Sequence, residues 1–252
     1  MMTTFAVLVK KELREQVRTH RLTVMVAVFL LFGLISPLTA KMLPELLKMA
    51  GEGMVPQLPT PTSLDALDQY LKNLTQMGLL AIILTAMGTI ARERERGTAA
   101  MTLCKPVSRA AFVVSKFVAH GLVLAAAMAV GALACYYYVA IIWTPYDAAA
   151  FLASNGLLGL YLLVVLGLTL LASALFKRQL AAGGVAMSIF ILLSIVGGVP
   201  RVGDYTPGML LGWSRGLIAG TGDTAWPAFF VSLGIVAGSV LLAWLYFRNR
   251  EL

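Results

Sequence analysis

FLASNGLLGLYLLVVLGLTLLASALF, residues 151–176, is the stretch that most clearly indicates the class of structure. It contains no Asp, Glu, Lys, Arg or His. A helix of about 20 apolar residues crosses the roughly 30 Å hydrocarbon core of a bilayer, so this stretch is long enough to do so. Strands of a membrane barrel alternate in polarity, and this stretch does not. We therefore expect a transmembrane α-helix.

Five further apolar runs of similar length occupy both sides of this stretch. They are residues 22–40, 74–91, 117–143, 180–199 and 226–247. Of the 252 residues, 59% are hydrophobic and 13% are charged, against about 45–50% and 25% in soluble domains. A water-soluble globule is excluded. The sequence predicts an all-α integral membrane protein with six transmembrane helices in a single domain, residues 1–252.

The cationic residues indicate the orientation of these spans. With a cytoplasmic N-terminus, fifteen of the 20 Lys and Arg lie on the cytoplasmic side and five on the other. Cytoplasmic loops carry such an excess. We expect a multi-pass protein of a bacterial or archaeal plasma membrane with both termini cytoplasmic. The net charge of +8 does not indicate nucleic-acid binding, because the cations lie between apolar blocks rather than on a soluble surface.

Residues 1–21 predict an amphipathic helix in the membrane interface. At 100° per residue, one side carries apolar residues and the opposite side carries cations. The apolar side includes Phe5, Leu8, Val9, Leu13 and Val17, and the cations are Lys10, Arg14, Arg18 and Arg21. Lipid headgroups would meet the cations. The alternative is a cytoplasmic extension of the first span.

Two loops are predicted on the external side of the membrane. Residues 41–72 contain four prolines, and we expect two short helices there, 44–50 and 63–71, with Ser63 as the cap of the second. Residues 200–225 are similarly rich in Gly and Pro.

A search for catalytic motifs indicates no enzyme. The chain has no phosphate-binding GxxxxGK[ST] motif, no HExxH motif and no CxxC motif. Its two cysteines, Cys104 and Cys135, are interpreted as small apolar residues that fill space between helices. Gly212-Trp-Ser-Arg-Gly216 matches GxSxG. That motif needs a histidine base, and both histidines, His20 and His120, are predicted on the opposite side of the membrane. We expect no catalytic residue and no metal site.

Few polar residues are expected inside the spans. His120 is either a proton-relay group or, more simply, a residue close enough to the interface to reach water or headgroups. For Asn155 we expect a hydrogen bond between helices, and the alternative is a substrate ligand. No Asp, Glu, Lys or Arg is expected to be buried in a span. Gly234 and Gly238 form a GxxxG motif, which allows close helix packing within the protomer or between protomers.

The segment ARERERGTAAMTLCKPVSRAAFVVSKF, residues 91–117, predicts a docking element beneath the membrane. The charged run ends the second span in a solvated turn, and Gly97 breaks the helix. Thr98 then caps a short helix that Pro106 ends, and Ser108 caps the next. The apolar face of the short helix consists of Ala99, Ala100, Met101 and Leu103. The alternative is a plain basic loop at 92–116.

At these residues the chain resembles the permease subunits of type-2 ABC transporters, which carry an E-x-x-x-G-T segment and a P-[VL]-S-R-like turn. The matching positions are Glu93, Gly97, Thr98, Leu103, Pro106, Val107, Ser108, Arg109 and Lys116. The basic N-terminal helix and the six spans agree with the family. Permeases of nitrous oxide reductase maturation and of small bacterial drug or antibiotic exporters look most similar.

The resemblance implies an exporter permease that docks a separate ABC ATPase through Glu93, Gly97–Met101, Leu103, Pro106 and Arg109. ATP and Mg²⁺ would bind that ATPase, and this chain would hold no cofactor. A second permease protomer, identical or different, would complete the pathway between protomers. The rival hypothesis is a membrane scaffold or sensor that binds a partner without transport.

Overall fold

The structure, a computed structural model, describes residues 2–50, 60–98 and 108–248, and all secondary structure in these ranges is helical. Six of its helical segments are long and apolar enough to cross a membrane, as the sequence predicts. They are Arg21–Glu45, Ser63–Glu95, Arg109–Ile142, Ala148–Leu175, Gln179–Gly197 and Trp226–Arg248. The chain is therefore an all-helical integral membrane protein.

The first span is longer than predicted. Helix α2 (Arg21–Ala50) continues through Pro37 and Pro44, so the prediction of a separate helix at 44–50 is wrong. Proline removes one backbone hydrogen bond, but membrane helices tolerate this loss where neighbouring groups satisfy the freed carbonyl.

The second span begins inside the segment that the sequence assigns to the first external loop. Helix α3 (Ser63–Asn73) leads through the π-helical turn η1 (Leu74–Gly78) into α4 (Leu79–Ala86). Its cap is Thr62 rather than Ser63. The Thr62 hydroxyl accepts from the Asp65 backbone, and the Asp65 carboxylate accepts from the Thr62 N–H at 2.7 Å. This capping box satisfies two backbone donors at once, which explains the helix start.

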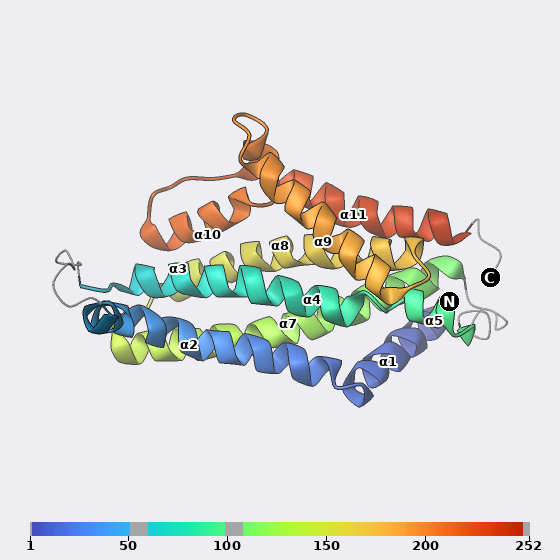
Figure 1. Ribbon diagram of the computed structural model, residues 1–252, viewed down its shortest axis with the longest axis horizontal. Coiled ribbons are helices and arrows are strands. Elements are labelled where there is room, and N and C mark those ends of the chain that lie inside the picture. Colours follow the sequence, from blue (N-terminus) through green and yellow to red (C-terminus); the bar gives the residue numbers. More distant parts are fainter. Residues whose placement is uncertain (1, 51–59, 99–107, 249–252) are drawn as a thin grey trace.

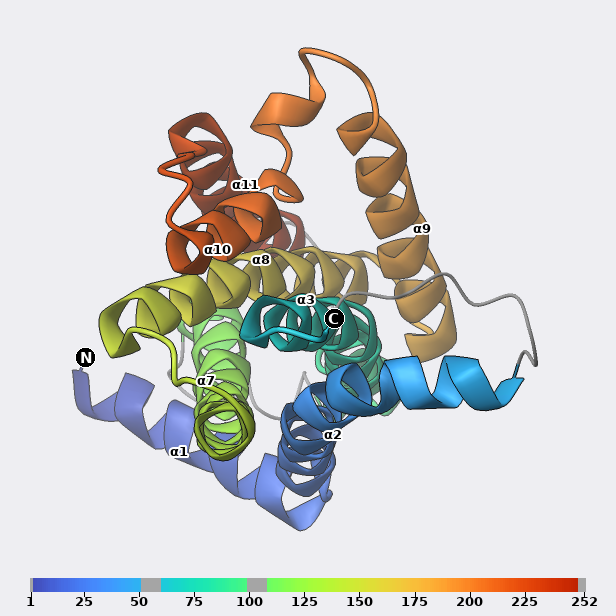
Figure 2. The ribbon, with the colours of Figure 1, turned by 90° about the vertical axis from the view of Figure 1, so that its left-hand side faces the viewer.

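The third span begins at its predicted cap, and the fourth span lies at the centre of the bundle. Helix α7 (Arg109–Ile142) begins at its predicted cap, where the Ser108 hydroxyl accepts from the Ala111 N–H at 3.1 Å. Helix α8 (Ala148–Leu175) is the most enclosed span. Within its apolar 18-residue stretch, 78% is buried inside the protein, against 22% for each of the last two spans. In Figure 2, α10 (Met209–Ala219) and α11 (Trp226–Arg248) lie on one side of α8, and α3 and α7 lie on the other.

The second external segment is helical rather than only a loop. After α9 (Gln179–Gly197) come a 3-10 turn, η2 (Gly203–Tyr205), and α10 (Met209–Ala219). With 11 residues, α10 is too short to span a bilayer, and it packs on α8. Ser214 of the GxSxG match is fully buried, with its hydroxyl 2.6 Å from that of Ser154. It is a helix-packing residue. The last span is α11 (Trp226–Arg248).

A very close backbone approach between two membrane-spanning helices occurs where α2 crosses α7. A Cβ on Gly33 would lie 2.4 Å from the Gly131 carbonyl oxygen, and a Cβ on Gly131 would lie 2.7 Å from the Phe29 oxygen. Both distances are too short for any side chain. A Cβ on Gly234 or Gly238 would meet nothing within 4 Å. The predicted GxxxG motif therefore makes no close contact within the described protomer, and packing between protomers stays a prediction.

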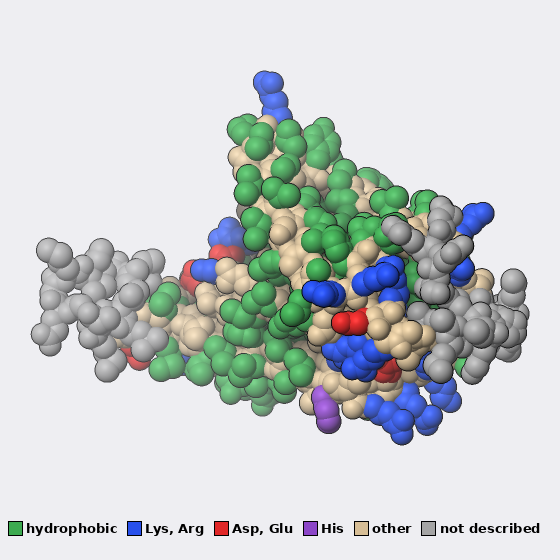
Figure 3. Space-filling model, turned by 45° about the vertical axis from the view of Figure 1, so that its right-hand side comes forward, with side chains coloured by type: hydrophobic (Ala, Val, Ile, Leu, Met, Phe, Trp, Pro, Cys, Tyr) green, Lys and Arg blue, Asp and Glu red, His purple; other side chains and the backbone are tan. Residues whose placement is uncertain are grey.

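The outer surface of the bundle is apolar, as a lipid environment requires. Figure 3 shows hydrophobic side chains over the long helices and Lys and Arg gathered toward one end. Leucines such as Leu84, Leu133, Leu152 and Leu180 are each at least 64% exposed. Lipid solvates such residues without the cost that water would impose.

Candidate functional site at the charged end of the bundle

The residues that the sequence singles out for docking lie at one end of the bundle. Helix α1 (Met2–Arg18), helix α5 (Ala91–Glu95), the start of α7 and the end of α11 gather there (Figure 1). Ile90, Phe112, Ala174 and Phe247 form a small hydrophobic cluster beneath them. Helices α7, α8 and α11 and the turn before α5 pack together in this cluster and hold this end together.

Lys116 of α7 is the centre of a buried ion cluster, which we define as Lys11, Glu12, Glu93 and Lys116. Its Nζ lies 3.0 Å from both carboxylate oxygens of Glu12 and 2.8 Å from Glu93 Oε1. The side chain is only 1% exposed. A buried ammonium is costly unless it is paired and hydrogen-bonded, and here the carboxylates of α1 and α5 pair with it.

Lys11 closes the cluster on the α1 side. Its Nζ lies 3.4 Å from Glu12 Oε1 and 3.6 Å from Glu93 Oε1. Burial acts to raise the pKa of Glu12, but the ammonium groups of Lys116 and Lys11 outweigh it and hold that pKa below its ordinary value. Burial acts to lower the pKa of Lys11, and the carboxylates of Glu93 and Glu12 raise it overall. Both shifts favour the charged forms of Glu12 and Lys11.

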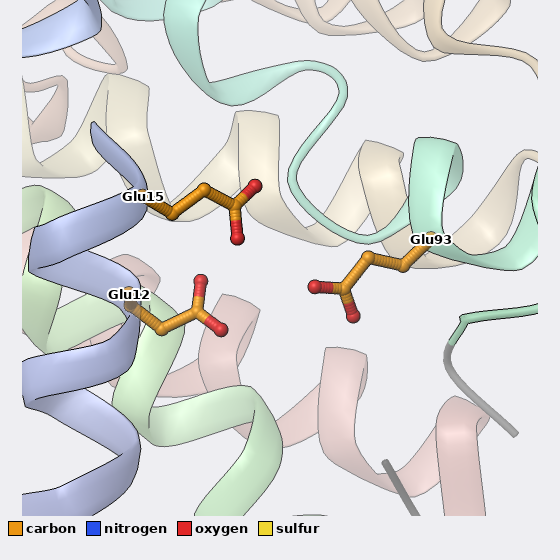
Figure 4. Close-up of side chains that lie close together, drawn as sticks. All are labelled: Glu12, Glu15 and Glu93. Carbon is orange, nitrogen blue, oxygen red and sulfur yellow. The ribbon is translucent and has the colours of Figure 1, made fainter. Parts of the chain in front are cut away.

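Three carboxylates in this region approach one another closely enough to suggest a metal site. Oxygens of Glu12, Glu15 and Glu93 all lie within 4.8 Å of one another (Figure 4). However, the ammonium of Lys116 contacts two of these carboxylates directly. A divalent cation would have to share the space with that charge. The donor set therefore fits an ammonium ion, and we assign no metal there.

His120 lies one turn beyond Lys116 and is buried, at 6% exposure. Its Nδ1 lies 2.9 Å from the Lys116 carbonyl oxygen, and its Nε2 lies 3.1 Å from the Thr89 hydroxyl. The Gln16 amide lies 3.3 Å from Nδ1. The simpler prediction for His120, contact with water or headgroups, is wrong because α1 covers this side chain.

The expectation that no charged residue is buried in a span is also wrong. It places Lys116 in the loop before the third span, whereas α7 begins at Arg109 and carries Lys116 two turns inside the helix. Asn155, in contrast, behaves as predicted, because its side-chain oxygen accepts from the Tyr70 hydroxyl at 2.7 Å.

The charged run after α4 is bound to the bundle rather than fully solvated. The Ser173 hydroxyl accepts from the backbone N–H groups of Ile90 and Ala91, at 2.9 and 3.0 Å. The Arg92 guanidinium donates to Gln179 Oε1, and Arg94 donates to the Ala174 carbonyl. Glu95 and Arg96 are exposed. The prediction of a solvated turn thus holds only for the end of this run.

The structure describes part of the predicted docking residues. Gly97 is exposed with a φ of +71°, which agrees with the predicted helix break. The Thr98 hydroxyl donates to the Glu93 carbonyl at 3.3 Å. Arg109 donates to the carbonyls of Phe247 and Arg248, so it ties α7 to the end of α11. Ala99, Ala100, Met101, Leu103 and Pro106 lie outside the described residues.

Helix α1 is present as predicted, but the residues of its apolar side differ in burial: some pack against the bundle and others are exposed. Lys10, Arg14 and Arg18 are exposed; Phe5, Val9 and Leu13 are half-buried; and Val17 is 54% exposed. The edge that contacts the bundle consists of Leu8, Glu12 and Gln16. The sequence did contain a signal for this edge, because two polar residues spaced four apart interrupt the apolar side.

Comparison with known proteins gives a consistent result. The model of a family described as "ABC-2 family transporter protein" matches residues 6–204, which is most of the chain. The chain is also similar to YxlG of Bacillus subtilis (strain 168), an uncharacterised transmembrane protein. The two are 26% identical over 196 residues, which covers 77% of this chain and 76% of that protein.

Proposed function

Because this chain belongs to the ABC-2 family of transporter proteins, we propose that it is the permease subunit of an ABC exporter. A separate ATPase subunit binds ATP and Mg²⁺ and docks at the charged end of the bundle. A second permease protomer completes the translocation pathway, which lies between the protomers. The protein resides in a plasma membrane with both termini in the cytoplasm, and the cytoplasmic leaflet's lipids contact α1.

The buried ion cluster is the observation that carries this proposal. Lys116 joins α1, α5 and α7 through contacts of 2.8–3.0 Å. The 92–116 segment connects α5 to α7 along the chain, so a partner that moves this segment pulls on both helices. Removing one partner of a buried ion pair costs about 3–5 kcal/mol. The three helix ends therefore resist separation and transmit motion together.

The contacts of α5 extend this connection to the centre of the protein. Its first backbone N–H groups donate to Ser173 of α8, and Arg92 reaches Gln179 of α9. Because α8 packs between the two halves of the bundle (Figure 2), displacement at α5 reaches the spans rather than a loose loop. This favours a transporter over a scaffold, which needs no such mechanical path.

The excess of cations at the same end supports a cytoplasmic location for it. Figure 3 shows Lys and Arg gathered there, and cytoplasmic segments carry this bias. ATP is hydrolysed in the cytoplasm, so the ATPase has access to this end.

The test is purification of the tagged chain from its native membrane, followed by mass spectrometry of bound proteins. We expect a stoichiometric ABC ATPase, and ATP-dependent accumulation of substrate in inverted vesicles. A variant with Met101→Glu and Leu103→Glu should lose the ATPase. Its matched control is the double variant Val199→Glu, Val202→Glu, which places the same two charges at exposed apolar residues (46% and 49% exposed) far along the sequence, between α9 and η2.

Loss of the ATPase from the double variant and its retention by the control would support docking at residues 98–103. A chain that purifies without any ATPase, but with another stoichiometric partner, would support the scaffold or sensor hypothesis instead.

A further inference from the structure

A cavity lies at the end of the bundle opposite the ion cluster, between the second span and α10. Its volume is about 360 Å³, which lies within the range of about 300–1,000 Å³ typical of small-molecule sites. One wall is built by α3 and η1, and the other by α10. Figure 1 shows α3 and α10 at the end away from α1 and α5.

The lining of this cavity is amphiphilic. Leu71 and Leu211 supply apolar surface from opposite walls. At the edge, Arg215 donates to both oxygens of Asp68, at 2.7 and 2.9 Å. Lys72 also lines the cavity, and it has no ion-pair partner within the described ranges. With Asp68 neutralising Arg215, the lining therefore retains one positive charge.

A second, independent feature is a buried hydroxyl group in the same wall, that of Thr75. Thr75 lies in the π-helical turn and lines the cavity. Its buried Oγ1 has no hydrogen-bond partner among the described residues. Thr85, in the regular helix that follows, donates to the Ala81 carbonyl at 2.7 Å. Buried polar groups are nearly always hydrogen-bonded, and π-turns frequently mark functional sites.

We propose that this cavity binds an anionic amphiphile. Its negatively charged head lies against Lys72 and accepts a hydrogen bond from Thr75, while its alkyl portion lies along Leu71 and Leu211. Two sources have this chemistry, an anionic phospholipid of the adjacent leaflet and a free alkyl anion. The inference goes beyond the proposed function, because it concerns binding to this chain without ATP or an ATPase.

Gly212 provides a reporter position inside the cavity. It lines the α10 wall, is exposed, and a Cβ there would meet nothing within 4 Å. A Gly212→Cys variant, made in a chain whose Cys104 and Cys135 are replaced by Ala, should therefore fold normally. Val202→Cys in the same background is the control, because Val202 is an exposed residue that does not line the cavity.

The first measurement compares two thiol reagents of similar size and opposite charge. These are sulfonatoethyl methanethiosulfonate and trimethylammonioethyl methanethiosulfonate. Relative to position 202, position 212 should favour the anionic reagent by about tenfold, as expected for a cleft that concentrates one sign of charge. Lys72→Gln should remove most of this preference. An unchanged preference in Lys72→Gln would contradict the assigned head position.

The second measurement is protection of the Gly212→Cys thiol from a neutral thiol reagent. Slower modification in nanodiscs that contain phosphatidylglycerol than in pure phosphatidylcholine would identify a lipid. Slower modification when octyl phosphate is added to phosphatidylcholine nanodiscs, but not when octyl glucoside is added, would identify a free alkyl anion. Thr75→Val should weaken either effect. Protection by neither phosphatidylglycerol nor octyl phosphate would overturn the proposal, whatever the result with charged reagents.

Discussion

The ammonium of Lys116 in α7 lies 3.0 Å from each carboxylate oxygen of Glu12 in α1, although the two residues are 104 positions apart. This bidentate contact fastens the N-terminal helix to a transmembrane helix below the surface. Because Glu93 approaches the same ammonium to 2.8 Å, α5 is fastened at the same point. The ion pairs that fasten α1 and α5 to α7 thus share a single buried cation.

Replacing that cation should be strongly destabilising. Lys116→Met leaves two carboxylates buried without their main partner, and we expect a loss of about 3–5 kcal/mol in the free energy of unfolding. The measurement is equilibrium unfolding in mixed micelles. The triple variant Glu12→Gln, Glu93→Gln, Lys116→Met removes all three charges and should recover most of the loss. Equal instability of the single and triple variants would show that packing, not charge, accounts for the effect.

Acidification should release α1. The pKa of Glu12 is lowered from its ordinary value of 4.5, so its ionised form stabilises the docked helix above pH 4.5. That contribution is lost as the pH falls below 4.5 and through the folded-state pKa. Spin labels at Arg18 and Leu122, both exposed, should report a broader distance distribution at low pH. Glu12→Gln should show a smaller change over this window.

The crossing of α2 and α7 should tolerate no side chain. Gly33→Ala places a methyl group 2.4 Å from a carbonyl oxygen, and forcing the helices apart should cost about 1–3 kcal/mol in protomer stability. Gly234→Ala is the matched control, because its Cβ meets nothing within 4 Å. Unfolding of both variants, measured in monomer-forming detergent, checks this prediction. A larger loss of unfolding free energy in Gly234→Ala than in Gly33→Ala would contradict the helix arrangement.

The topology can be tested at two exposed charged residues. In a cysteine-free background, Asp223→Cys should react with an impermeant thiol reagent added outside intact cells, and Lys177→Cys should react only after lysis. The expected orientation follows from the bias of Lys and Arg. The reverse pattern would place the charged end outside and exclude a cytoplasmic ATPase at that end.

The two sides of α1 should respond differently to charge. Leu8 is buried against the bundle, whereas Val17 is 54% exposed. Val17→Asp should weaken membrane association of α1 without unfolding the protomer, because only lipid contact is lost. Leu8→Asp should instead lower the unfolding temperature, since a carboxylate without a designated partner would enter the protein. Depth measurements by spin-label quenching, together with thermal unfolding, distinguish the two effects.

Several features could be predicted from the sequence because they depend on local or summed properties of the chain. The length of each apolar run predicts six membrane-spanning helices, and the Ser108 cap and the Gly97 break follow from side-chain and backbone preferences over a few residues. The resemblance likewise placed Glu93 and Lys116 in one motif. It did not indicate that these two residues contact each other or that Glu12 joins them.

Other features were decided only by the tertiary structure. The sequence predicts GxxxG packing at Gly234 and Gly238, but the close helix crossing lies at Gly33 and Gly131, which lie on different helices and share no motif. The extent of α3 and the packing of α10 were missed for a related reason. Gly and Pro content indicates a loop locally, whereas a neighbouring helix can bury such a segment and stabilise it.

The ion cluster illustrates the physical reason most clearly. Periodicity places Glu12 and Gln16 on one side of α1, and composition identifies Lys116 as a cation near a membrane boundary. Whether a charge can be buried depends on which opposite charges enclose it and how well water is excluded. Those conditions arise only when α1, α5 and α7 meet. The sequence by itself therefore determined the membrane-spanning helices, and tertiary packing determined which of their polar residues became a buried connection between them.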